Sequence, residues 1–113
     1  MNKQMMTEML KGTLEGVVLS AISRRAAYGY EITAWLREQG FADIAEGTVY
    51  ALLVRIEQRG LVDVSKQPSE KGPPRKVFSI NSAGQAHLED FWSSWQVLSA
   101  RLERLRKDQN NVA

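Results

Sequence analysis

The sequence predicts a single mostly helical α+β domain that ends in one long helix. Two observations support this. Apolar residues recur at helical spacing in four separate segments of the 113-residue chain. Two short runs of alternating apolar and polar residues, at 61 to 66 and 75 to 80, flank a turn that contains Gly72, Pro73 and Pro74. The composition, 43% apolar and 25% charged, is ordinary for a globular domain.

Two helices are predicted before residue 40. The first spans Met5 to Ser23 despite Gly12 and Gly16, with an apolar face at Met6, Met9, Leu10, Leu14, Val17, Val18 and Ile22. The second spans Tyr28 to Gln39 and ends at Gly40, with Tyr28, Ile32, Trp35 and Leu36 as its core face. Gly29 and Tyr30 are interpreted as packing features of this second helix.

The third helix, from Glu46 to the stop at Gly60, has two contrasting faces. Its core stripe is Val49, Leu52, Leu53 and Ile56, at the i, i+3, i+4, i+7 spacing. The opposite face carries Gly47, Tyr50, Ala51, Val54, Arg55 and Gln58, which are small, aromatic, amide and guanidinium groups. Arg can fork onto guanine and Gln onto adenine in a major groove. We therefore choose Thr48, Tyr50, Arg55 and Gln58 as DNA contacts, although an ordinary amphipathic core helix fits this stretch equally well when taken alone.

A basic hairpin follows this helix directly. Its strands are residues 61 to 66 and 75 to 80, and its long tip is 67 to 74. The segment from 66 to 76 has a net charge of +3, because one acidic residue, Glu70, stands against Lys66, Lys71, Arg75 and Lys76. A basic hairpin after a groove-facing helix is the layout of a winged helix-turn-helix, in which the hairpin contacts phosphates and the helix reads bases. These four basic residues are the expected phosphate contacts.

The last predicted helix has Ser82 as its N-cap and ends near Lys107. Its apolar residues alternate at spacings of 3 and 4, as in a coiled-coil seam: Leu88, Phe91, Trp95, Leu98, Leu102 and Leu105. Packing on the domain's own first helix would cover part of a seam of about 27 Å. We therefore expect a homodimer. The predicted organisation is a winged helix-turn-helix DNA-binding domain at 1–81, a C-terminal dimerisation helix at 82–107, and a frayed polar tail at 108–113.

Four ordered blocks resemble the PadR family of bacterial transcriptional regulators. They begin at Leu14-Glu15-Gly16, Tyr28-Gly29-Tyr30, Glu46-Gly47-Thr48-Val49-Tyr50 and Gly72-Pro73-Pro74, the last followed by Arg75-Lys76-Val77-Phe78 and Ala83-Gly84. The single helix after the hairpin is similar to the short subgroup of this family. The resemblance implies DNA binding, repression and a dimer formed by the first and last helices. Two groove-facing helices about 34 Å apart would then require an inverted-repeat operator on double-stranded DNA.

A small-molecule site at the dimer centre is a further expectation. Trp92 and Trp95 lie one turn apart, and Met6 and Met9 offer flexible thioethers on the first helix. From the residues alone, plain interface core is the somewhat better interpretation. The family resemblance favours a flat aromatic or apolar effector, because Trp95 matches the tryptophan against which some short members bind such drugs.

The remaining features argue against other classes of function. The chain has no cysteine, and its single histidine, His87, is interpreted as a solvated surface residue, so we expect no metal, no cofactor and no catalysis. No apolar run reaches membrane-spanning length and no signal core appears, which predicts a cytoplasmic protein without membrane contact. The alternative function is a winged-helix module that binds another protein. Its binding would lack the steep salt dependence of DNA binding.

Overall fold

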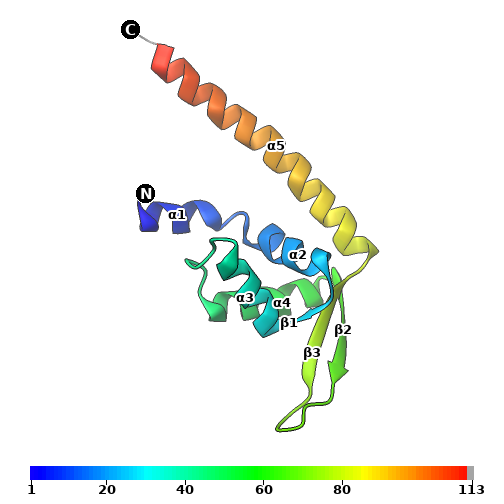
Figure 1. Cartoon of the computed structure of the whole chain (residues 1–113). Helices are drawn as coiled ribbons and strands as arrows, with labels where there is room; N and C mark the ends of the chain where they lie inside the picture. Colours follow the sequence, from blue (N-terminus) through cyan, green and yellow to red (C-terminus); the bar gives the residue numbers. More distant parts are fainter. Residues whose placement is uncertain (112–113) are drawn as a thin grey trace.

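The computed structural model describes residues 1–111 as five α-helices and one small antiparallel sheet (Figure 1). The elements in chain order are α1 (Lys3–Leu10), α2 (Leu14–Arg24), β1 (Ala27–Tyr28), α3 (Gly29–Glu38), α4 (Glu46–Gln58), β2 (Val62–Gln67), β3 (Arg75–Ile80) and α5 (Ser82–Asn111). This is the predicted mostly helical α+β winged helix-turn-helix. Among the described residues, no helix is both long enough and apolar enough to cross a membrane.

The predicted first helix, Met5 to Ser23, is wrong as one continuous element, because α1 and α2 are separate helices. The break lies at residues 11–13, where both the backbone N–H and the hydroxyl of Thr13 donate to the Leu10 carbonyl, at 2.8 and 2.9 Å. A Thr that bonds its local backbone in this way competes with helix continuation, and the glycine at position 12 adds no helix preference. None of the α1 side chains is buried.

The core lies between α2, α3 and α4. Its fully buried side chains are Val18, Leu19, Ile22, Ile32, Leu36, Val49, Leu53 and Ile56. The predicted apolar stripe of α4 therefore faces inward, which leaves the opposite face of this helix exposed. Gly60 ends α4 with a φ of 73°, and the Leu61 N–H donates to the Ile56 carbonyl at 3.0 Å. This left-handed glycine cap turns the chain directly into the hairpin.

The sheet has the strand order β1-β3-β2, with both pairings antiparallel. The strand β3 occupies the predicted segment, and β2 begins and ends one residue later than predicted. Val62 pairs with Ile80, and Lys66 pairs with Lys76. The strand β1 was not predicted, since two residues are too short to show an alternating pattern. It pairs Ala27 with Phe78 and so fastens the base of the hairpin to the start of α3.

Helix α5 leaves the body on the side opposite the hairpin tip and extends far beyond the core (Figure 1). The molecule consequently measures 66 × 30 × 20 Å. The predicted Ser82 N-cap is wrong: Ser82 is the first helical residue, and the side chain of Asn81 accepts the Gly84 N–H at 2.9 Å. The helix also passes the predicted end at Lys107 and continues to Asn111, so the predicted frayed tail is helical over 108–111. Its last two positions, 112 and 113, lie outside the described residues.

Candidate nucleic-acid interface

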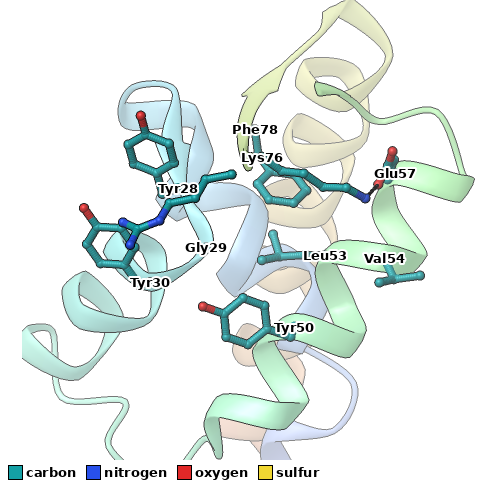
Figure 2. Close-up of a pocket in the computed structure, with 10 residues that line it drawn as sticks. Tyr28, Gly29, Tyr30, Tyr50, Leu53, Val54, Glu57, Lys76 and Phe78 are labelled. Carbon is teal, nitrogen blue, oxygen red and sulfur yellow. Dashed lines mark hydrogen bonds and ion pairs between the residues drawn. The ribbon is translucent and has the colours of Figure 1, made fainter. Parts of the chain in front are cut away.

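A groove of about 850 Å³ separates the hairpin from α4 (Figure 2). The start of α3 closes one side, the outward face of α4 forms another, and β3 forms the third. The groove is lined by Tyr28, Gly29, Tyr30, Tyr50, Leu53, Val54, Glu57, Arg75, Lys76 and Phe78. The lining combines tyrosine hydroxyls, the cations of Arg75 and Lys76, and one carboxylate, Glu57, around an apolar floor. Hydroxyls and cations are suited to the phosphates and sugars of a nucleic-acid strand.

Tyr50 approaches the start of α3 because Gly29 has no side chain. A Cβ at Gly29 would lie 2.6 Å from the Tyr50 ring, which is closer than any carbon contact allows. The helix begins here because the Tyr28 N–H donates to the Glu31 carboxylate at 2.9 Å. The interpretation of Gly29 as a packing feature is therefore confirmed.

Tyr30, which was given the same interpretation, packs on neighbouring side chains but is also half exposed and lines the groove. Its ring stacks on that of Tyr28 with centroids 5.7 Å apart, and the Arg75 guanidinium lies 5.4 Å from its centre. Tyr30 lies in the first turn of α3, and the N-terminus of a helix favours anions such as phosphate. No pattern in the sequence indicated Tyr30, because its place in the groove depends on β1, a strand of two residues.

The hairpin brings its predicted cations close together. Lys66 and Lys76 are directly paired across β2 and β3, and both side chains are exposed. Like charges at opposite positions destabilise a sheet unless an anion lies between them. Lys76 also lies 3.3 Å from Glu57, which connects the hairpin to α4 (Figure 2). Lys71 lies near the tip and, with Tyr30 and Arg75, lines a second hollow.

The residues predicted on α4 do not all meet in this groove. Tyr50 does, whereas Thr48 lines a smaller hollow of about 330 Å³ beside α1. Gln58 is exposed at the last residue of the helix. Arg55 lies on the flank that faces α2, with its Nε 3.8 Å from the Glu15 carboxylate. Among the predicted DNA contacts, the groove therefore collects Tyr50, Arg75 and Lys76.

His87 is not the solvated surface residue that was predicted. Its Nε2 lies 2.8 Å from Oε1 of Glu15, and only 35% of its side chain is exposed. The two residues are far apart in the sequence, and α2 and α5 bring them together. Sequence spacing carried no signal of this contact.

The apolar seam of α5 divides into two parts. Leu88 is buried and Phe91 packs on α2, where its ring lies so close to Gly16 that a Cβ there would be 2.4 Å away. The alternative that the seam packs on its own domain thus holds for its first two residues. The later side chains of the seam are 44 to 66% exposed, and they are Trp95, Leu98, Leu102 and Leu105. Trp92, which lies next to the seam, is 51% exposed. Met6 is half-buried on α1, and Met9 is 63% exposed.

The core helices, the hairpin and the groove between them define a winged-helix protein. A model of the transcriptional regulator PadR-like family matches residues 18–90. The chain belongs to this family, whose members are DNA-binding transcriptional regulators.

Solved structures agree with this assignment. A PadR-like transcriptional regulator from Bacillus cereus is 39% identical, covers 87% of this chain and 95% of its own, and has a TM-score of 0.75. A Streptococcus transcriptional regulator is 41% identical over 87% of this chain and 96% of its own, with a TM-score of 0.76. A PadR family regulator from Eggerthella lenta is 31% identical over 90% and 88%, with a TM-score of 0.82.

Proposed function

We propose that the protein is a homodimeric repressor that binds an inverted-repeat operator and releases it when a small aromatic or apolar molecule binds. The observation that carries the DNA-binding part is the groove between α4 and the hairpin, where Tyr50, Arg75 and Lys76 meet. Thr48, Arg55 and Gln58 complete the proposed contacts from α4, and Lys66 and Lys71 complete those from the hairpin. Tyr30, which the structure adds, is proposed to contact a phosphate.

The proposed dimer rests on the exposed part of the α5 seam. A continuous row of large exposed apolar side chains on one helix is typical of a surface that a partner covers. A second copy supplies a surface of the same length and the same spacing. Its twofold symmetry would present two α4 helices to successive turns of the major groove.

The proposed hairpin contacts make a prediction about salt. Replacing Lys71 and Lys76 together by Ala is expected to weaken binding to operator and to random DNA alike, because phosphate contacts carry no sequence information. The slope of log K against log salt should flatten by up to about 2, roughly one for each contact removed. Fluorescence anisotropy with labelled duplexes at several salt concentrations measures both quantities.

The matched control is the pair Lys3→Ala and Lys107→Ala, which removes the same charge from α1 and α5. Its salt slope should equal that of the wild type. An unchanged slope in the hairpin variant would show that the hairpin does not contact DNA. Binding of a protein partner with little salt dependence would favour the alternative, a winged-helix protein-interaction module.

The proposed effector site makes a prediction about Trp95. It is 44% exposed and lies one helical turn from Trp92, and the dimer would bring the copies of both near each other. Trp95→Phe retains most of the apolar contact but reduces the aromatic face. The variant should remain dimeric and bind operator, yet bind flat aromatic dyes more weakly and lose less DNA affinity when dye is added.

Dye titration and tryptophan quenching measure this, with sedimentation to verify the dimer. Trp35→Phe is the control, because Trp35 packs against the core and under the Arg24 guanidinium at 4.2 Å. Dye binding should be normal in that variant. If wild-type Trp95 is shielded from quenchers and no dye binds, Trp95 is interface core only and the effector proposal is wrong.

A further inference from the structure

One carboxylate on α2 contacts side chains from two other helices. Oε1 of Glu15 contacts Nη1 of Arg59 and lies 2.8 Å from Nε2 of His87, while Oε2 lies 3.8 Å from Nε of Arg55. These four residues are called the Glu15 cluster here. Arg55 comes from α4, Arg59 caps the C-terminal end of α4, and His87 comes from α5. None of the four lines the groove between α4 and the hairpin.

The exposures in this cluster differ in a way that matters for DNA binding. The Glu15 side chain is 17% exposed and is fixed by its two contacts at Oε1, whereas that of Arg55 is 67% exposed and lies at the 4 Å edge of an ion pair. The carboxylate is therefore the fixed partner and Arg55 the mobile one. The Arg59 side chain is 43% exposed, and it lies closer to the Glu15 carboxylate than Arg55 does.

The charges have a second consequence. Arg55 in the last turn of α4 and Arg59 at its C-cap are one turn apart, so their guanidinium groups repel each other. Without Glu15, both would be unpaired cations on the helix that faces DNA. Unpaired arginines bind any phosphate, and such contacts raise affinity for all sequences equally. A weak ion pair, in contrast, can still yield to a forked contact with guanine.

We propose that Glu15 is a specificity-determining residue. It holds Arg55 and Arg59 on the α2 flank of α4, where they do not contact phosphates of random DNA, and releases Arg55 only to a base edge. His87 and Arg59 position the carboxylate for this role. This inference rests on the proposed DNA binding and adds to it the restraint of non-specific binding.

Glu15→Gln tests the proposal, because Gln retains the size of the side chain and removes its charge. The variant is expected to bind random duplex DNA roughly three- to fivefold more tightly, with a salt slope steeper by up to about 1. Operator affinity should change less, so the ratio of random to operator Kd falls. Anisotropy titrations on both duplexes, with thermal unfolding to verify the fold, give these values.

Two controls separate this role from bulk charge and from structure. Glu103→Gln makes the same charge change at an exposed α5 ion pair with Arg106, and its ratio should equal that of the wild type. In a background with Arg55→Gln and Arg59→Gln, Glu15→Gln should no longer tighten random binding.

Three results would overturn the inference. They are an unchanged ratio in Glu15→Gln, an equal change in Glu103→Gln, and a ratio change that persists without the two arginines. Any of these, found while the wild type binds operator normally, leaves the proposed function standing. Failure of the wild type to bind any duplex would overturn the proposed function and this inference together.

Discussion

Replacing Leu98 and Leu102 by Gln is expected to convert the protein from a dimer to a monomer and to remove most of its operator binding. The two side chains are 49% and 45% exposed, so each can bury about half of a leucine in a dimer. That is worth about 1 kcal/mol per side chain, or roughly 4 kcal/mol for the four in a dimer, a loss of about a thousandfold in dimer affinity. Analytical ultracentrifugation across a concentration series measures it.

The control places the same polar residues on the other side of the helix. Ala100→Gln and Arg104→Gln lie opposite Leu98 and Leu102 at 3.6 residues per turn, and this pair should remain dimeric. A monomeric wild type at micromolar concentration would contradict the proposed interface. So would a Leu98→Gln, Leu102→Gln variant that sediments as the wild type does.

The second large effect is expected from Gly84→Ala, which should lower the melting temperature by roughly 5 to 10 °C. A Cβ at Gly84 would lie 2.0 Å from the Leu61 carbonyl oxygen and 2.7 Å from the Ile80 side chain. The carbonyl belongs to the backbone that joins α4 to β2, so α5 must move away from it. Overpacking of this kind costs typically about 1 to 3 kcal/mol, at about 4 °C per kcal/mol in a domain of this size.

Gly12→Ala is the matched control, since no atom lies within 4 Å of a Cβ built there. Its melting temperature should be unchanged or slightly higher. Calorimetry or circular dichroism compares the three proteins. Equal melting of Gly84→Ala and wild type would show that α5 is not seated on the hairpin base as the structure has it.

The sequence predicted the elements whose periodicity is strong. The two faces of α4, the Gly60 stop and the hairpin strands are each specified by nearby residues, so their patterns can be interpreted without tertiary information. The break between α1 and α2 could not be predicted in this way, because Thr13 replaces helix bonds with its own local ones. The N-cap of α5 was predicted wrongly for the same reason. Asn81 competes with Ser82 for this helix end, and it is the Asn81 side chain that accepts the Gly84 N–H.

The candidate site was predicted only in part, for a related reason. Charge and aromatic character indicated Tyr50, Arg75 and Lys76, which the fold then brings into one groove. The position of Tyr30 in that groove depends on β1, a strand too short to predict. The contacts of Glu15 with Arg59 and His87 join α2 to the C-cap of α4 and to α5, and no sequence spacing specifies such a meeting. Such contacts between residues far apart in the sequence are determined by how the helices pack against one another.

The most direct test of the proposed DNA binding is to select tightly bound duplexes from a random DNA pool and to measure the stoichiometry on the selected site. We expect an inverted repeat whose half-sites are about 10 to 10.5 base pairs apart from centre to centre, two protomers per duplex, and an affinity that falls steeply with salt. No enrichment of any sequence, or a single half-site bound by one protomer with the same affinity, would contradict it.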